Sequence, residues 1–237
     1  MSDKEILREE EIEEIEGGEE TTSGSGFQMG KTLLYTIIAV VLVVAGVGGY
    51  YFYKSGVKKD SIESTKALTR IIPLYQQNQF EKALMGDNSI LIDNKPLMGL
   101  VAIADKFKNE VGKQAAVYAA NSFMFTNKMN DAEKYFKMAA EAEDKLIKVA
   151  AYSGWAQCQE LQGKFAEAAD NYSKAADMSE TDNFKVKNML FAGLCFEKAN
   201  NKDKAVQNFK DVIGTNRVSE YARVAKGRLA LLGIIID

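Results

Sequence analysis

The sequence predicts an all-α protein in which a solenoid of helical hairpins follows one transmembrane helix. Three observations support this class. A pattern of small and aromatic residues occurs three times between residues 113 and 214, a 22-residue stretch carries no charge, and 237 residues contain two prolines. Proline disrupts helix interiors, so its scarcity suits a nearly all-helical chain.

The repeated pattern marks the second helix of each hairpin. The pattern recurs after 36 and then 37 residues. Within each copy its three members are spaced by four and then three residues, which is typical of one helix face. A second helical face lies upstream of this pattern in each copy and marks the first helix of the hairpin. It includes a small residue at Ala120, Ala156 and Gly193. One hairpin cannot bury its apolar face but three stacked hairpins can, so the period predicts a solenoid. The repeated residues are Ala132, Phe136 and Ala139, then Ala168, Tyr172 and Ala175, then Ala205, Phe209 and Val212.

The turn Gly163-Lys164-Phe165 and the residues that follow it resemble the tetratricopeptide repeat. Asn127 and Asn200 replace the turn glycine in the other two copies, and asparagine tolerates the same left-handed backbone. The resemblance covers about half of the chain. It implies a scaffold that binds proteins or peptides. Repeats of this kind serve many functions, so the resemblance says more about the fold than about the function.

The composition argues against catalysis. The chain contains no histidine, which removes the commonest general base, the commonest zinc ligand and every Ser-His or Cys-His dyad. We therefore expect no enzyme activity, no cofactor and no metal, and we expect no nucleic-acid partner.

The N-terminal residues 1–31 are predicted to form an acidic, disordered tail. Residues 1–26 hold ten acidic and two basic residues, a local charge of -8, whereas the whole chain carries -3 and the remainder therefore +5. Like charges at this density repel one another and disfavour a packed core. The alternative is a short amphipathic helix, with Ile6, Leu7, Ile12 and Ile15 on one face, that docks on a basic partner.

Residues 32–53 are predicted to form the transmembrane helix that anchors the chain in a lipid bilayer. They are uncharged and lie between Lys31 and Lys54, and 22 helical residues can cross a hydrocarbon layer of roughly 30 Å. The aromatic residues from Tyr50 to Tyr53 suit the headgroup region. A cleaved signal peptide would instead have a basic start, a shorter apolar run and small residues at its exit.

The lysines that flank this span predict its orientation. Lys31 precedes the span, whereas Lys54, Lys58, Lys59 and Lys66 follow it, and basic flanks favour the cytoplasm. By this count the large C-terminal body would be cytoplasmic.

Residues 54–112 are predicted to form an irregular N-terminal repeat with an insertion. Phe80 and Ala83 match Phe165 and Ala168, but the interval from Ala83 to Ala132 is 49 residues. We expect a helix over residues 60–79 with a kink at Pro73, an early break at Gly86, a loop through Pro96 and a helix over 97–108. Residues 215–237 are predicted to close the solenoid with a capping helix over 219–232.

This layout as a whole resembles YfgM-like, single-span bacterial envelope proteins. It combines the acidic tail, the span, an atypical first hairpin containing the segment 99–107, regular repeats and a terminal helix. The resemblance implies an inner-membrane protein with a periplasmic repeat domain that associates with the SecYEG translocon and with periplasmic chaperones. It disagrees with the lysine count, and we give it the greater weight because several features carry it.

Cys158 and Cys195 occupy equivalent positions in neighbouring hairpins. Packed helix axes lie roughly 8–10 Å apart, whereas a disulfide needs alpha carbons closer than about 7 Å. We therefore expect two core thiols rather than a disulfide.

The candidate binding site is the concave groove that the first helices of the hairpins would form. Of the Lys and Asn residues that clamp a peptide carboxylate in chaperone-binding relatives, Asn121 alone falls in place, so an apolar or helical segment is the expected ligand. A solvated face without a specific ligand is the alternative. The groove residues are Gln114, Val117, Asn121 and Met124; Ser153, Gln157 and Glu160; and Lys187, Leu190, Leu194 and Glu197.

The expected function is that of a membrane-anchored scaffold, either a translocon-associated or a chaperone-linked adaptor. Tethering at the membrane raises the effective concentration of a weak binding groove. Two alternatives remain: a structural scaffold for envelope, cell-wall or division complexes, and a docking receptor whose repeats lie in the cytosol.

Overall fold

The structure, a computed structural model, describes the backbone of residues 31–235, and the side chains of residues 31–41, 44, 48, 51–53 and 57 are outside this description. The chain divides into two units, Met1–Tyr53 and Lys54–Asp237. The tail predicted for residues 1–31 falls, apart from Lys31, outside the described residues.

Helix α2 (Lys31–Gln76) contains the residues of the predicted span, so their backbone is helical. Many side chains of residues 32–53 lie outside the described part of the chain. Among the residues that are described, no helix combines the length and the apolar character needed to cross a membrane. The helix continues through Pro73 and ends at Gln76.

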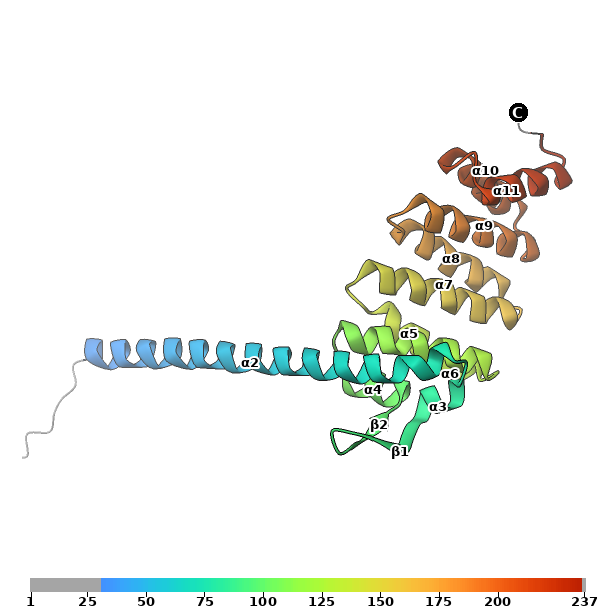
Figure 1. Ribbon diagram of the computed structural model, residues 1–237. Helices are drawn as coiled ribbons and strands as arrows, with labels where there is room; N and C mark the ends of the chain where they lie inside the picture. The colour runs from blue at the N-terminus through green and yellow to red at the C-terminus, as the bar shows by residue number, and fades with distance from the viewer. Residues whose placement is uncertain (1–30, 236–237) are drawn as a thin grey trace, which may run out of the picture. The chain divides into compact units, whose positions relative to one another are not determined.

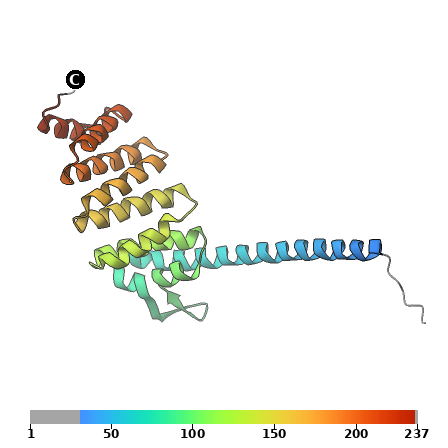
Figure 2. The ribbon, with the colours of Figure 1, turned by 180° about the vertical axis from the view of Figure 1, so that it is seen from behind.

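The second unit consists mainly of helices that pack in sequence order as hairpin-like pairs (Figures 1 and 2). The last helix, α11, packs on α10 and α9. The sequence therefore predicted the helical, repetitive character of this unit correctly. The pairs are α5 (Glu110–Phe125) with α6 (Met129–Ala140), α7 (Lys145–Leu161) with α8 (Phe165–Met178), and α9 (Asp182–Lys198) with α10 (Lys202–Thr215), followed by α11 (Glu220–Leu231).

The turn inside each pair has the same backbone geometry. Asn127, Gly163 and Asn200 adopt positive φ angles of 59°, 75° and 59°. The next amide closes each turn: that of Lys164 donates to the carbonyl oxygen of Gln159 at 2.9 Å, for example. This is the hydrogen bond of a Schellman helix ending, and it confirms that asparagine replaces glycine in two copies. Asn78, with φ 59°, makes the same turn between α2 and α3 (Phe80–Met85).

The segment between Gly86 and Met98 corrects two expectations. It forms two antiparallel strands, β1 (Gly86–Ile92) and β2 (Lys95–Met98), where a loop was predicted, so the fold is not purely α-helical. Asp93 and Asn94 connect the strands with φ angles of 53° and 60°, which are typical of a two-residue hairpin turn. Because β2 includes Leu97 and Met98, the next helix, α4 (Leu100–Lys106), begins later than predicted.

This β-hairpin is inserted into the second helix of the first repeat. It spans 13 residues, the number by which the interval from Ala83 to Ala132 exceeds the 36-residue period. Without the insertion, Leu100 and Ile103 align with Phe136 and Ala139, and all four are fully buried. The chain leaves and rejoins the helix at Gly86 and Gly99, where a Cβ on either residue would collide with the other's backbone. The two glycines therefore allow the strands to cross closely.

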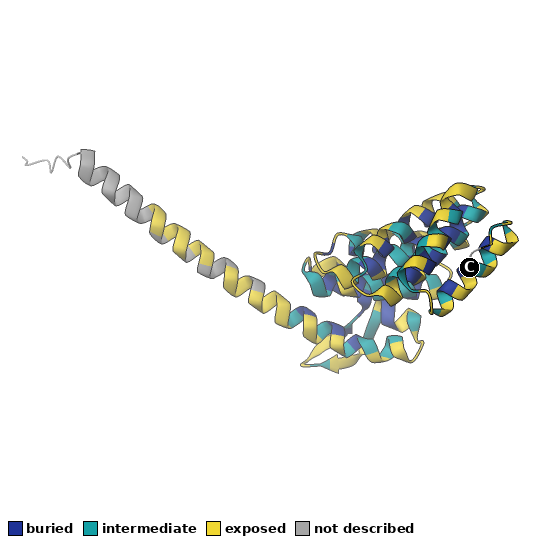
Figure 3. Cartoon of the chain, turned by 90° about the horizontal axis from the view of Figure 1, so that it is seen from above, coloured by how far each residue is buried: buried dark blue, intermediate teal, exposed yellow. Residues whose placement is uncertain are grey.

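The core lies between the helices of each pair and between successive pairs (Figure 3). The Phe136 ring of α6 packs directly against the backbone of Gly154 on α7. At the corresponding contact of the next pair, Tyr172 stacks on Phe191 with ring centroids 5.4 Å apart. The large residue of the second helix therefore fills the space between neighbouring hairpins, as the repeat pattern predicts.

Cys158 and Cys195 are both free and buried, as expected for core thiols. Burial raises the pKa of both thiols, that of Cys195 to about 12, where the nearby Glu160 carboxylate adds to the effect.

Candidate protein-binding surfaces

The candidate groove residues lie on α5, α7 and α9, which are the first helices of the three pairs. Their accessibility differs widely. Gln114, Gln157 and Lys187 are exposed, whereas seven others are partly buried. Ligand contact therefore depends mainly on the three exposed polar residues. The partly buried residues are Val117, Asn121, Met124, Ser153, Glu160, Leu194 and Glu197.

One member of the predicted groove needs correction. Leu190 is 4% exposed and belongs to the core around α9, so it cannot contact a ligand on the surface. Val117, Met124 and Leu194 also pack against the core with part of their surface. The apolar residues proposed to grip a ligand therefore serve largely to pack neighbouring helices.

Ser153, a polar groove residue, joins two successive first helices. Ser153 of α7 donates a hydrogen bond to the Asn188 side-chain oxygen of α9 at 2.8 Å. Asn188 is itself buried and donates to the carbonyl oxygen of Phe184 at 2.9 Å. The Ser153 hydroxyl and the Asn188 amide thus replace their hydration with protein partners.

Two glutamates continue this connection at equivalent positions. The Glu160 carboxylate accepts from Lys198 at 2.7 Å, and this contact raises the pKa of the lysine. Glu197 accepts from the Arg228 guanidinium of α11 at 3.0 Å. Each glutamate therefore pairs with a cation of a later helix, Lys198 of α9 or Arg228 of α11, so its charge is already matched.

A second surface, which the sequence reasoning missed, lies where the hairpin turns line up. We call it the turn-edge strip and define it as Phe80, Phe125, Met129, Leu161 and Phe165. Phe125 and Leu161 hold the same position in successive repeats and are 68% and 62% exposed. The rings of Phe80 and Phe125 stack with centroids 4.5 Å apart, across neighbouring repeats. Phe80, Met129 and Phe165 are partly buried. Exposed apolar side chains that gather on one surface are typical of docking sites.

The strip becomes polar toward α9. The Lys198 ammonium lies 5.1 Å from the centroid of the Phe165 ring, in cation–π contact. Lys198 stands at the position that Phe125 and Leu161 occupy in the preceding repeats. The sequence signal for this strip is an apolar residue two places before the turns at Asn127 and Gly163, where solvent should favour a polar one.

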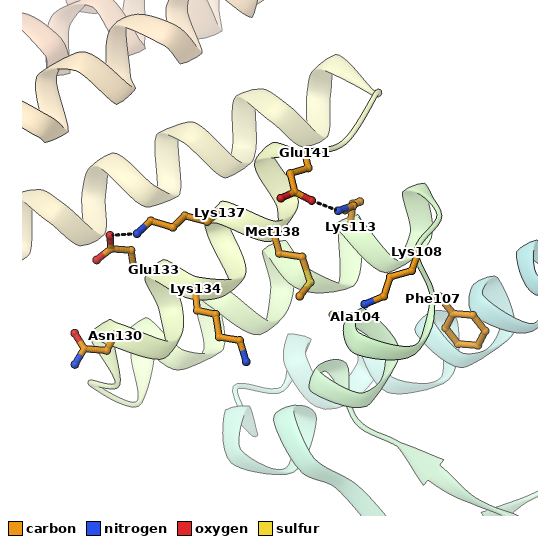
Figure 4. A pocket seen from close by; sticks show the side chains of 10 residues that line it. All are labelled: Ala104, Phe107, Lys108, Lys113, Asn130, Glu133, Lys134, Lys137, Met138 and Glu141. Atoms are coloured by element: carbon orange, nitrogen blue, oxygen red, sulfur yellow. Dashed lines mark hydrogen bonds and ion pairs between the residues drawn. The ribbon is translucent and has the colours of Figure 1, made fainter.

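A third candidate is a hollow of about 690 Å³ beside α4, α5 and α6 (Figure 4). Ala104, Phe107 and Met138 contribute apolar surface to it. Four lysines and two glutamates surround this surface, so the hollow is net basic. The charged residues are Lys108, Lys113, Lys134, Lys137, Glu133 and Glu141.

Two of these lysines are already paired. Lys113 donates to Glu141 at 2.9 Å and Lys137 to Glu133 at 2.7 Å, and both contacts lower the pKa of the glutamate. Lys108 and Lys134 point into the same space in Figure 4. The hollow can therefore accept carboxylates of an acidic protein segment.

Over residues 31–235, no group of three or more His, Cys, Asp or Glu side chains could hold a metal ion. No protein-family model matches the chain, and the search of curated proteins found no significant match.

Proposed function

We propose that this chain is a membrane-anchored, tetratricopeptide-type scaffold that binds proteins or peptides in the cell envelope. It acts as an adaptor associated with the protein translocon or with periplasmic chaperones. Residues 32–53 cross the inner membrane once, and the repeats extend into the periplasm.

The observation that carries this proposal is the repetition of equivalent surface positions along consecutive hairpins. Phe125 and Leu161 expose apolar side chains at the same position of two consecutive repeats. Solenoids use such extended, repeated surfaces for binding. An anchor formed by residues 32–53 would tether these surfaces to the membrane. Tethering raises their effective concentration and so strengthens weak contacts.

A second candidate is a docking receptor with its repeats in the cytosol. The excess of lysines after residues 32–53 favours it, since basic flanks tend to stay in the cytoplasm. The binding surfaces would be the same, but their partners would come from the other side of the membrane.

Site-specific photo-crosslinking in cells tests the adaptor function. A photoreactive residue replaces Phe125, Leu161 or Gln157 in the full chain, and the matched control replaces Asp170, which is exposed on α8. We expect translocon subunits or periplasmic chaperones to be captured from the first three positions and not from the control. Capture dominated by division or cell-wall enzymes would favour a structural scaffold instead, and equal capture from Asp170 would contradict a defined binding surface.

A further inference from the structure

A groove of about 520 Å³ separates residues 55–70 of α2 from the β-hairpin. All of its lining residues belong to the second unit of the chain. Its volume is within the range of small-molecule sites, roughly 300–1,000 Å³. Neither the repeats nor the proposed adaptor function accounts for it.

The floor of this groove is apolar. Ile62 and Ala67 line it from α2, and Ile92, Leu97 and Met98 line it from the hairpin. Ile62 is 50% exposed although it faces a hollow lined by other apolar side chains. A ligand with an apolar part would remove this surface from water, which is favourable.

The rim of the groove is basic. Lys58, Lys59, Lys66, Arg70 and Lys95 line it, against two carboxylates. The two acidic residues, Glu63 and Asp93, are already engaged. Glu63 accepts from Lys106 and Asp93 from Arg70, each at 2.6 Å.

Within the part of the chain that the structure describes, four lysines of the rim make no direct ion pair, although Lys59, Lys66 and Lys95 help to lower the pKa of Glu63 or Asp93. Among the described residues, Lys58, Lys59, Lys66 and Lys95 form no ion pair within 4 Å. Each can donate three hydrogen bonds. The groove thus offers positive charge at its rim and apolar contact at its floor, which matches an amphiphile with an anionic head.

We propose that this groove binds an anionic phospholipid, with the phosphate on the rim lysines and an acyl chain along the floor. The inference rests on the proposed membrane anchor, because the groove begins at Ser55, two residues after the end of the predicted span at Tyr53. Lysine ammonium groups are attracted to the negative charge of an anionic headgroup. A phosphate alone would leave the apolar floor uncovered, and a neutral lipid would leave the lysines unmatched.

Titration of the full chain in uncharged detergent tests this inference. The probe is a short-chain phosphatidylglycerol, compared with the matching phosphatidylcholine and with glycerol phosphate, which has the head but no acyl chains. We expect saturable binding of phosphatidylglycerol and at least about tenfold weaker binding of the other two. Equal binding of glycerol phosphate, or no saturable binding of the lipid, would overturn the proposal.

Variants assign the binding to the groove. Replacing Lys58, Lys59, Lys66 and Lys95 by glutamine should weaken binding at least about tenfold, whereas the same change at Lys202, Lys204, Lys210 and Lys226, all on α10 and α11, should leave it unchanged. Ile62→Ser should weaken the lipid but not glycerol phosphate. Unchanged binding in the groove variant would place the lipid elsewhere and overturn the proposal.

One further measurement separates failure of this inference from failure of the proposed function. Membrane retention of the parent chain, measured by alkaline extraction, reports on the anchor and not on the groove. Retention without selective lipid binding would refute this inference and leave the proposed function standing.

Discussion

The ring of Phe136 on α6 lies against Gly154 on α7, so closely that a Cβ at residue 154 would meet the ring atoms Cε1 and Cζ. The equivalent positions in the neighbouring repeats are Tyr118 and Phe191. Phe136 is fully buried, and the glycine makes room for it. Two residues on different hairpins therefore determine how close those hairpins come.

Replacing Gly154 by alanine should destabilise the protein. The methyl group must displace a fully buried ring, and overpacking of this kind costs about 1–3 kcal/mol. Denaturant unfolding of the parent and of each variant measures the change in unfolding free energy. The matched control is Gly227→Ala on α11, where nothing lies within 4 Å, and there the helix should gain about 0.5–1 kcal/mol. Equal effects at the two positions would contradict the packing described here.

The β-hairpin should be removable. Deleting residues 86–98 brings Met85 next to Gly99 and restores a continuous helix in the register of the other repeats. We expect the shortened chain to keep its cooperative unfolding and to gain helical circular dichroism. Loss of cooperative unfolding would show that the hairpin is needed for the first repeat.

The effect of Gly99→Ala should change sign with this deletion. In the parent, a Cβ at residue 99 collides with the backbone of Leu84, Met85 and Gly86, so the change should cost about 1–3 kcal/mol. In the shortened chain residue 99 lies inside a helix, where alanine should be better than glycine by about 0.5–1 kcal/mol. Unfolding free energies of the four proteins test this, and a constant effect would contradict it.

The two cysteines should react with thiol reagents only after the protein unfolds and exposes them. Both are buried, and the pKa of Cys195 is raised to about 12, so little thiolate is present at neutral pH. The control is Gln157→Cys on exposed α7 surface, which should react quickly and faster from pH 7 to pH 9. Comparable rates for Cys195 and this control in the native protein would disprove the burial.

Glu133 should contribute to stability above mildly acidic pH. Its pKa is lowered in the folded state by the hydrogen bond from Lys137, so its contribution is present above the unfolded pKa and is lost as pH falls through the folded value. Glu133→Gln should lower the unfolding free energy at pH 7 by less than about 1 kcal/mol. The difference in unfolding free energy between parent and variant should vanish near pH 2. At pH 7 it should be smaller in a Lys137→Met background.

Much of the fold could be predicted because the repeat pattern reports directly on packing. Ala132, Phe136 and Ala139 lie on one helix face, and all three are fully buried. Asn127 and Asn200 could be placed in turns because few residue types tolerate their backbone geometry. These features depend on local rules that act in every copy.

The β-hairpin and the groove required information that local pattern does not contain. Ile90 and Leu91 are exposed on β1, so the strand lacks the alternation that predicts a half-buried strand. Leu190 was placed on the concave face because periodicity identifies a helix face but not the neighbour that covers it. The exposure of Phe125 and Leu161 depends on which side chains of the neighbouring repeats cover them, which the repeat pattern alone does not specify.

The central claim is that residues 32–53 anchor the repeats at the membrane with the C-terminus outside the cytoplasm. We would test it with the full chain tagged after Asp237, by alkaline extraction of membranes and protease treatment of intact spheroplasts. The account predicts that the tag stays with the membrane pellet and is digested from outside, while a cytoplasmic control protein survives. A tag released into the supernatant would contradict the anchor, and a tag retained but fully protected would place the repeats in the cytosol.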